Sequence, residues 1–487
     1  MILPLRQWSA AHASIQCDLA RRFFRASTFS SLAIVATLVA NVALVRADDS
    51  ILLFDFEHPA FAQRWAAVRS IQVERKSAPA YDAPEPASAT NSFAPAGAAL
   101  AIHTAGQGGL YTTGTIAQRD WSDIESLAFW VYRQPPPGVP VPSVMEVQFI
   151  EADGKARFWR RIVLEHEGWQ RIELPLYWFR WGEGRVPQWD RVARLGFWFR
   201  DAVDVVIDSV AIAKGRPDAA TLTLDRLSPV AFPSGDETKI RRMESPSVRV
   251  LTDASELDIK RLGTHLEQVA MTLRRDLGEA RSASPATLLV FENESAYRSF
   301  PRRLAKQMGS SAAAPRSSGY TLHGIATSSW SDQYGTLRPV YTHEFVHSLV
   351  ALSTGIPNHG QWLHEGLAVR YQLRFHPQAD FRAIVLRGLG DDSLRLPLAE
   401  LCTDNSIPNE RYWQAMTVVE MLIEDDRFSA CWPKLLAAFS LGGSANLAPH
   451  LESILATDWD ELESTWRAYC ETEYGGGNTA ELQETPR

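Results

Sequence analysis

The sequence has little cysteine and no excess of basic charge. Its 487 residues include four Cys, and 49 Lys and Arg are outnumbered by 57 Asp and Glu, for a formal charge of -8. This balance argues against nucleic acid as a partner, and four cysteines are too few for a disulfide-rich scaffold. The last three, Cys402, Cys431 and Cys470, lack the spacing of a zinc cluster. In an oxidising compartment one pair could form a structural bridge and leave one thiol free.

The sequence also lacks an apolar run of the roughly 20 residues that a membrane-spanning helix needs. The best candidate is the largely apolar Ser31–Val45, which follows RRFFR at 21–25 and ends in VRA at 45–47. This is the layout of a cleaved signal peptide. We therefore expect residues 1–47 to direct export to the periplasm, cell surface or medium, with an uncleaved N-terminal membrane anchor as the alternative.

A metal-binding motif stands out in the second half of the chain. Residues 341–350 read YTHEFVHSLV and contain His343, Glu344 and His347 in the order H-E-x-x-H. On a helix, residues four apart lie one above the other, so both imidazoles can reach one zinc ion from one face. Glu344 lies about 100° round the helix, where it can take a proton from water that zinc has activated.

A second motif supplies a third ligand. Residues 362–368 read WLHEGLA and open another helical run, which contains Glu365. The intervening residues suffice to end the first helix, turn at 355–360 and bring a second helix back antiparallel. A third histidine ligand would need Gly at 350 and His at 353, but the sequence has Val350 and Ser353. The pattern therefore predicts a site with two histidines and one glutamate.

HEFVH followed by WLHEGLA resembles the gluzincin metallopeptidases, the clan of thermolysin, and particularly its small bacterial peptidase MA-like members. The resemblance covers about residues 247–474 and implies an α+β catalytic domain. It also implies that His343, His347 and Glu365 bind one catalytic zinc ion and that Glu344 is the general base. His364 stands where the clan commonly has Asn.

The same resemblance implies how substrate is held. In the gluzincin plan the strand before the zinc helix is an edge strand that pairs with extended substrate backbone. Residues 320–327 occupy that place, which makes Tyr320, Thr321 and Leu322 the candidate substrate-binding residues. The Gly-x-Met-Glu-Asn motif with which aminopeptidases hold a free N-terminus is absent, and this favours endopeptidase action.

One further catalytic residue is suggested by resemblance. Residues 411–415 read RYWQA and resemble the Tyr-x-x-Gly/Ala segment of related enzymes, whose tyrosine stabilises the tetrahedral intermediate. Tyr412 is therefore the candidate oxyanion donor, with a structural tyrosine as the competing interpretation. Tyr371 is the alternative donor.

Residues 48–214 follow a different pattern. Short alternating or aromatic-rich segments between turn residues predict an antiparallel β-sandwich of jelly-roll type. The expected strands are 51–57, 100–103, 126–133, 144–151, 159–164, 170–174, 195–200 and 205–212. The segment resembles galactose-binding-like carbohydrate-binding modules in FDFE at 54–57, GWQRI at 168–172 and IDSV at 207–210.

That resemblance implies a fold and leaves sugar binding open, because the same architecture also serves as a neutral packing domain. Most tryptophans of this segment are expected in its core. If one surface binds glycan, the candidates are Trp178, Trp181 and Trp189, which lie in a Gly/Arg-rich loop. Glu57 and Asp208 are candidates for a structural calcium ion, although two carboxylates do not define a site.

The remaining segments complete the predicted organisation. Residues 215–246 are polar and are interpreted as a linker, residues 247–474 as the metallopeptidase domain, and residues 475–487 as a disordered tail. The expected catalytic domain begins with a strand at 248–251 and an amphipathic helix through Leu277.

Together these features predict an exported, multidomain zinc metallopeptidase, an endopeptidase acting on protein or peptide, with a mostly helical C-terminal part. The sandwich would direct it to a glycan or envelope surface. The alternative is a catalytically silent, zinc-containing glycan-binding protein of the envelope surface, and the intact Glu344 favours the enzyme. The sequence leaves the oligomeric state open.

Overall fold

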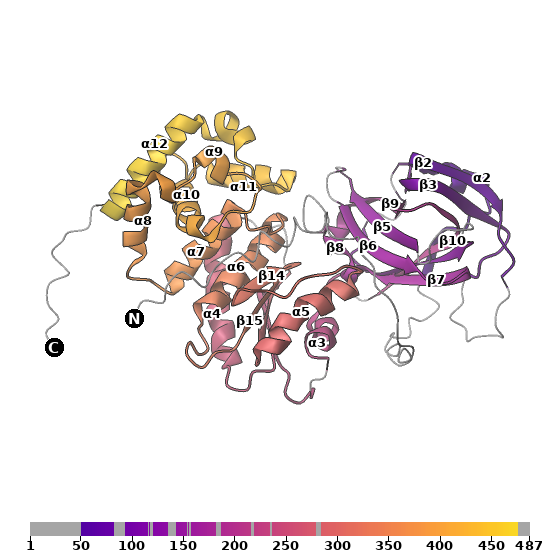
Figure 1. Ribbon diagram of the computed structural model, residues 1–487, viewed down its shortest axis with the longest axis horizontal. Helices are drawn as coiled ribbons and strands as arrows, with labels where there is room; N and C mark the ends of the chain where they lie inside the picture. The colour runs from indigo at the N-terminus through magenta and orange to yellow at the C-terminus, as the bar shows by residue number, and fades with distance from the viewer. Residues whose placement is uncertain are drawn as a thin grey trace, which may run out of the picture.

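The computed structural model describes residues 50–475 except for 82–92, 115, 117–119, 135–142, 153, 155–156, 182–186, 216–218, 234–235 and 279–283. The predicted export segment 1–47 and residues 476–487 of the predicted tail lie outside the described residues. Among the helices that the structure describes, none is long and apolar enough to cross a membrane. The chain forms an N-terminal β-domain and a C-terminal domain of sheet and helices (Figure 1).

The N-terminal domain is a 10-stranded antiparallel sheet in the order β7-β4-β10-β3-β9-β5-β6-β8, in which β1 also pairs with β10 and β2 with β3. Its strands are β1 (Ser50–Phe54), β2 (Trp65–Ser77), β3 (Ala98–Thr112), β4 (Ile124–Arg133), β5 (Ser143–Glu151), β6 (Arg157–Leu164), β7 (Gly168–Pro175), β8 (Arg180–Trp181), β9 (Val192–Phe199) and β10 (Val203–Lys214). A short helix, α2 (Pro59–Gln63), precedes β2.

The long strand β3 folds this sheet into two facing layers. Its first half pairs with β10 and its second half with β9. Side chains of the two layers meet in one core, where the rings of Phe129 on β4 and Phe197 on β9 have centroids 5.1 Å apart. Strand β5 places Met145 and Val147 in this core, at alternating positions as a half-buried strand requires. The predicted antiparallel sandwich is confirmed.

The C-terminal domain contains a 5-stranded sheet in the order β11-β12-β13-β15-β14. Its strands are β11 (Arg241–Glu244), β12 (Val248–Thr252), β13 (Ala286–Phe291), β14 (Gly319–Leu322) and β15 (Ile325–Ser329). The strands β12, β13 and β15 are parallel, and β11 and β14 run antiparallel to their neighbours. The predicted single strand 320–327 is instead a hairpin. Its two-residue turn, His323 and Gly324, has φ of 51° and 72°, as a type I′ turn requires.

Helices cover this sheet and fill the far end of the domain (Figure 1). They are α3 (Leu224–Ala231), α4 (Ile259–Leu277), α5 (Glu294–Gln307), α6 (Pro339–Thr354), α7 (Trp362–Phe375), α8 (Phe381–Gly390), α9 (Leu398–Leu401), α10 (Tyr412–Glu424), α11 (Trp432–Gly442) and α12 (Trp459–Cys470). One large apolar cluster joins β12 and β13 to α4, α6, α7 and the later helices. Helix α6 is buried along almost its whole length.

The predicted linker 215–246 is not a plain linker, because it contains α3 and β11. Helix α3 has only eight residues and carries Pro229, so its local sequence signal is weak, and tertiary packing must stabilise it. Its buried Leu227 lies in an apolar cluster with Phe300 of α5 and with Trp178. Trp178 belongs to the sandwich, in the 3-10 turn η4 (Leu176–Trp178). The two domains therefore share a core at their junction.

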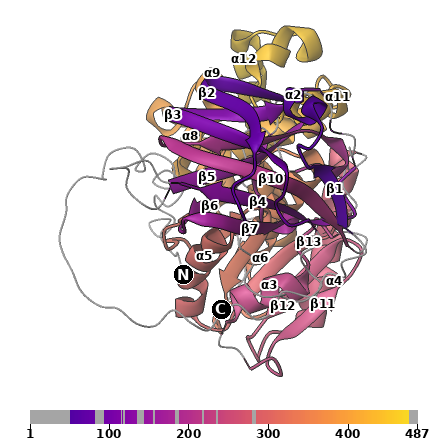
Figure 2. The same ribbon diagram turned by 90° about the vertical axis from the view of Figure 1, so that its right-hand side faces the viewer.

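A partly open cavity of about 730 Å³ also lies at the junction. Tyr177 and Arg191 line it from the sandwich, and Arg249 and His323 line it from the C-terminal domain. Figure 2 views the molecule from the sandwich end, with α3 and α5 below the strands of the sandwich. Beside this contact, a Cβ atom at Gly309 would lie only 2.1 Å from the carbonyl oxygen of Arg161.

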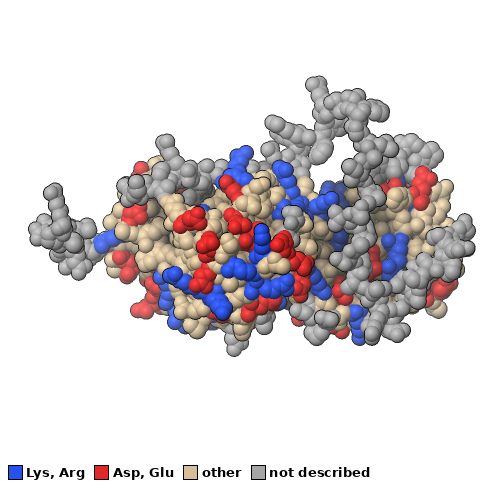
Figure 3. Space-filling model, turned by 90° about the horizontal axis from the view of Figure 1, so that it is seen from below, with Lys and Arg blue, Asp and Glu red and all other residues tan. Residues whose placement is uncertain are grey.

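Two features of the composition are visible in the fold. On the face seen in Figure 3, acidic and basic side chains are interspersed. The three cysteines of the described residues, Cys402, Cys431 and Cys470, are free thiols, so the bridge that one pair could form is absent among them. Cys402 and Cys470 are buried, and burial raises the pKa of both thiols, that of Cys470 to about 12.

Candidate metal centre

Helix α6 carries three polar side chains into an apolar interior. Pro339 stands at its first position, where a missing N–H costs nothing, and Gly355 ends it in the left-handed conformation. Between these ends, His343, Glu344 and His347 are 3%, 5% and 2% exposed. Burying ionisable groups is costly unless they are paired or coordinate a metal. Their burial therefore calls for a specific partner.

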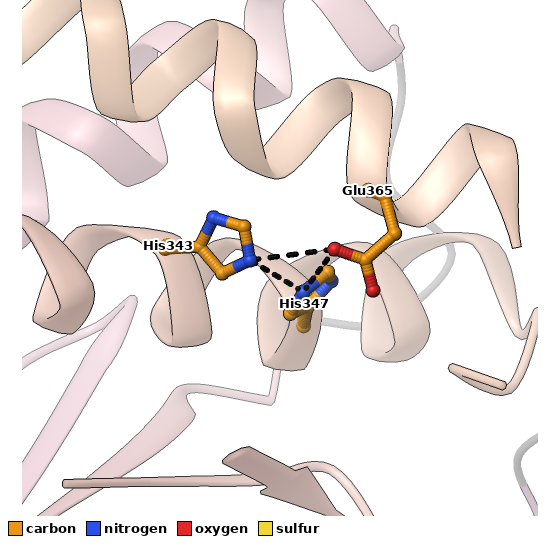
Figure 4. Close-up of side chains that lie close together, drawn as sticks. All are labelled: His343, His347 and Glu365. Carbon is orange, nitrogen blue, oxygen red and sulfur yellow. Dashed lines mark hydrogen bonds and ion pairs between the residues drawn. The ribbon is translucent and has the colours of Figure 1, made fainter. Parts of the chain in front are cut away.

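That partner is Glu365 on the next helix, α7, with a side chain 1% exposed. Figure 4 shows the two imidazoles and this carboxylate pointing toward one another. The Nε2 atoms of His343 and His347 are 3.1 Å apart, and Oε2 of Glu365 is 3.4 Å and 3.5 Å from them. Within the described part of the chain, these residues are the one group of three or more His, Cys, Asp or Glu with ligand atoms so close together.

The donor triangle fits a zinc ion. A tetrahedral zinc with bonds of about 2.0–2.1 Å separates its ligand atoms by about 3.3–3.4 Å. The point in their plane that is equidistant from the three donor atoms lies about 1.9 Å from each, close to the length of a zinc bond. If these three residues bound zinc, they would leave a fourth position for water or substrate, as in catalytic rather than structural zinc sites.

The electrostatics of the triangle also suit a cation. Burial raises the pKa of Glu365, but the charges and hydrogen bonds of His347 and His343 outweigh it and hold that pKa well below its usual range. Burial lowers the pKa of His343, but the hydrogen bond and charge of Glu365 outweigh it and leave that pKa raised. Glu365 is therefore a carboxylate at neutral pH, the form in which it can bind a metal.

Glu344 is held beside the triangle by strand β14. Its Oε2 lies 2.8 Å from the hydroxyl of Thr321, which is also 2.9 Å from the backbone oxygen of Glu344. Gly319 provides the space, because a Cβ there would lie 2.7 Å from Cγ and 2.9 Å from Oε1 of Glu344. One turn further along α6, Ser348 donates a hydrogen bond to the carbonyl of Gly324. Helix α6 is thus bonded to the hairpin at two points.

The predicted substrate strand lies at the edge of its sheet, as expected, but its three predicted substrate-binding side chains do not share one role. β14 is at one end of its sheet and pairs only with β15 in the part of the chain that the structure describes. Tyr320 is 7% exposed and lies in the apolar cluster of α5, with its ring centroid 5.2 Å from that of Tyr297. Leu322 packs against the same cluster. Of the three predicted residues, Thr321 is the one whose side chain contacts Glu344.

The structure separates the two tyrosine candidates. The ring of Tyr412 stacks with that of His343, with centroids 6.4 Å apart. Burial raises the pKa of its phenol well above the usual range, and the nearby Glu365 carboxylate adds to this effect. Tyr371 instead donates a hydrogen bond to Asp276 of α4, away from the triangle. Tyr412 therefore keeps its proton at neutral pH and is the tyrosine placed next to the candidate metal ligands.

His364 and Gln372 lie next to the two histidines of the candidate site. Nε2 of His364 donates to the carbonyl of Ile356 at 3.0 Å, and burial lowers its pKa to about 3, so the ring is neutral. Its centroid is 5.7 Å from that of His347. Gln372, two turns after Glu365 on α7, lies against His343, where its side chain favours the protonated imidazole. The i, i+7 spacing from Glu365 is the sequence signal that identifies Gln372.

Two of the three predicted glycan tryptophans are buried. Trp178 is 8% exposed in the shared core, and Trp189 is 9% exposed with its ring against Phe149, Phe158 and Phe179. Both rings are thus largely covered, although Trp189 also lines the cavity at the domain junction, and glycan binding at these two residues stays a prediction. Trp181 lies in β8, and its side chain is outside the described part.

The proposed calcium ligands have other partners. Glu57 accepts a hydrogen bond from the backbone N–H of Ala98 at 3.0 Å, and Asp208 accepts from Ser209 and Ala96 at 2.7 Å and 3.1 Å. Burial raises the pKa of Asp208 to about 7, and the charge of Glu57 contributes to the increase. Both carboxylates thus fix loop backbone, and a calcium ion at this corner stays a prediction.

The sandwich has another aromatic surface that sequence reasoning missed. Tyr111 of β3, Trp159 of β6 and Trp198 of β9 are half-buried and lie on the outer side of the layer β6-β5-β9-β3. We call this surface the aromatic face. Alternation predicts which strand residues point outward, but the grouping of these three depends on strand register across the sheet.

No protein-family model matches this sequence, and no curated protein matches it. Among solved structures, the chain is similar to the family 11 carbohydrate-binding module of the cellulosomal cellulase Lic26A-Cel5E of Clostridium thermocellum (14% identity, 34% of this chain and 95% of that chain covered, TM-score 0.25). It is also similar to the CBM22-1 xylan-binding domain from Paenibacillus barcinonensis Xyn10C (11%, 36% and 94%, 0.22) and to the agarase AgWH50C (11%, 48% and 32%, 0.27). Similarities at these TM-scores do not assign a function to the chain.

Proposed function

We propose that this protein is a zinc-dependent hydrolase that cleaves peptide bonds. The observation that carries the proposal is the convergence of His343, His347 and Glu365 on a point at zinc-bonding distance, with Glu344 buried beside it. The choice of peptide bonds rests on β14, an edge strand next to Glu344, to which an extended peptide can add as a further strand.

Each residue of the site then has a definite task. Zinc, when bound, polarises a carbonyl oxygen and makes water acidic enough to lose a proton near neutral pH. Glu344 accepts that proton at the oxygen that Thr321 does not hold and passes it to the leaving amine. Tyr412, protonated at neutral pH, donates a hydrogen bond to the developing oxyanion. Deep burial of the ligands keeps bulk water from weakening these interactions.

The test is Glu344→Gln in the full-length protein, with zinc measured by elemental analysis and hydrolysis measured on casein and a peptide library. Zinc should remain at about one ion per chain, because Glu344 is not a ligand, while hydrolysis is lost. Glu400→Gln, at an exposed residue of α9, is the control and should behave as wild type. Wild-type protein without zinc after metal-replete purification, or a fully active Glu344→Gln, would refute the proposal.

A second function, glycan binding by the sandwich, has support of its own. The aromatic face offers Trp159 and Trp198 at partly exposed positions, and flat aromatic rings are suited to the apolar faces of sugars. Glycan binding is compatible with hydrolysis elsewhere in the chain. It would be the sole function if the zinc site proves inert.

Trp198→Ala tests this second function. Full-length protein should be retarded in gels that contain the recognised polysaccharide, and the variant should migrate freely while remaining folded. Equal retardation of both proteins would remove the aromatic face from the proposal.

A further inference from the structure

The register of the strands gives the aromatic face a defined chemistry. On the outer side of β5, Glu146 lies opposite Arg161 of β6 and Trp198 of β9. Two residues along, Gln148 lies opposite Trp159 and Gly196. The carboxamide of Gln148 accepts a hydrogen bond from the hydroxyl of Tyr111 at 2.6 Å. The aromatic face thus combines aromatic rings, the Gln148 amide and charged side chains on neighbouring strands.

Two glycines let the rings lie flat on the sheet. A Cβ at Gly109 would lie 2.5 Å from the ring of Trp198, and a Cβ at Gly196 would lie 2.1 Å from the ring of Tyr111. Each ring therefore occupies the place of a missing side chain on the neighbouring strand. Rings pressed against the sheet present one broad face outward, which is the geometry of a platform for a flat chain rather than of a closed pocket.

Arginines surround this platform in excess. Glu146 binds both Arg161 and Arg200, with Oε1 3.0 Å and 2.8 Å from their Nη2 atoms. Arg69 stacks its guanidinium 5.0 Å from the ring centroid of Trp198. Arg194 lies on the outer side of β9, opposite Ile150 of β5.

Arg157 is the fifth arginine of the face. It lies opposite Ile150 on β6 and is close enough to Tyr111 to lower the pKa of its phenol, which burial raises. Among the described strand positions of this face, Glu146 is the one carboxylate that faces the five arginines. This local excess of positive charge contrasts with the formal charge of -8 for the whole chain.

We propose that the aromatic face binds an acidic polysaccharide, a chain of sugars that carries carboxylate or sulfate groups. This inference rests on the proposed glycan binding and specifies its ligand. Guanidinium groups bind carboxylates and sulfates through paired hydrogen bonds, while the rings stack on the apolar faces of the sugars. A neutral glucan would stack on the rings but offer no charged group to the guanidinium groups.

The experiment compares a charged and a neutral polysaccharide with the full-length protein. Polygalacturonate and mixed-linkage β-glucan are used as probes in isothermal titration calorimetry at low and at moderate salt. Polygalacturonate should bind more tightly than β-glucan, and its affinity should fall as salt rises, because guanidinium–carboxylate attraction is screened. The double variant Arg157→Gln with Arg194→Gln should bind about tenfold more weakly and with a smaller salt dependence.

Arg171→Gln is the matched control, since Arg171 lies on β7 in the opposite layer with a side chain 40% exposed. Its affinity should equal that of wild type, and an equal loss there would show general charge attraction and overturn the inference. Equal affinity of wild type for both probes would also overturn it while leaving glycan binding intact. Binding of neither probe would refute this inference and leave Trp198→Ala on a wider glycan panel to judge the proposed function.

Discussion

Gly319→Ala should reduce catalysis far more than it reduces stability. The added methyl group would lie 2.6 Å from Cγ2 of Val340, 2.7 Å from Cγ of Glu344 and 2.9 Å from its Oε1. Carbon atoms in favourable contact are about 3.5–4.0 Å apart, so neighbours must move by roughly 0.8–1 Å. Val340 is β-branched and confined by the helix, whereas the Glu344 side chain is unbranched and can rotate. We therefore expect Glu344 to move.

The two costs can be estimated separately. Overpacking a core by one methyl group costs about 1–3 kcal/mol of stability, and the side-chain rotation should keep the loss near the lower end. Glu344 would lose the hydrogen bond from Thr321, and a misplacement of about 1 Å lowers turnover by about 10²-fold. Zinc content should stay at about one ion per chain, because the ligands are on other positions of α6 and α7.

The assay is kcat and KM on a peptide substrate, with zinc content and denaturant unfolding measured on the same preparations. Gly390→Ala is the control, because a Cβ at this exposed position of α8 meets nothing within 4 Å. It should retain wild-type turnover. The reasoning fails if Gly319→Ala keeps wild-type kcat, or if it loses zinc and activity together, since zinc loss would mean that α6 moved instead of Glu344.

Three further substitutions test residues next to the candidate metal site and at the domain junction. Tyr412→Phe should lower kcat by about 10²–10³-fold with little change in KM, and wild-type kinetics would make Tyr412 structural. The pKa of His364 is about 3 in the folded protein against 6.5 ordinarily, so the unfolded chain binds more protons as pH falls below 6.5 and folding weakens. Zinc-free wild type should lose about 2 kcal/mol more stability than His364→Asn between pH 7 and pH 5, measured by urea unfolding, and equal losses would contradict this. Trp178→Ala should destabilise the protein by about 3–5 kcal/mol, seen as an earlier unfolding midpoint, and a change in glycan affinity alone would show that Trp178 is a surface residue.

The side-chain cluster of the candidate metal site could be predicted from the sequence because its signals are local. The spacing of His343 and His347 and the second helix with Glu365 follow from helical periodicity, and the structure brings the three together. Most strands of the sandwich were equally visible from alternation and turn residues. Contacts between residues far apart in the sequence could not be predicted in this way. The hydrogen bond from Thr321 to Glu344 and the space that Gly319 leaves for Glu344 have no local sequence signal.

The tryptophans illustrate the same limit. Trp178 and Trp189 stand among Gly and Arg, which reads as a surface loop, yet each is covered by residues far away in the sequence. Trp159 and Trp198 stand in strands of a segment whose tryptophans were mostly expected in the core, yet strand register places both on the outer side of the layer, where Gly109 makes room for the ring of Trp198. The residues next to a tryptophan in the sequence therefore predicted its exposure poorly, because that exposure depends on strand register.

The core shared at the domain junction determines how this chain can be divided. A cut near residue 235 would leave α3 and Trp178 on one fragment and α5 on the other, and both would expose apolar surface that is now covered. Such fragments are expected to aggregate, as exposed apolar patches do. The sandwich is therefore not an exchangeable module, and transplanting it onto another protein would require η4 and α3 to be redesigned with polar surfaces.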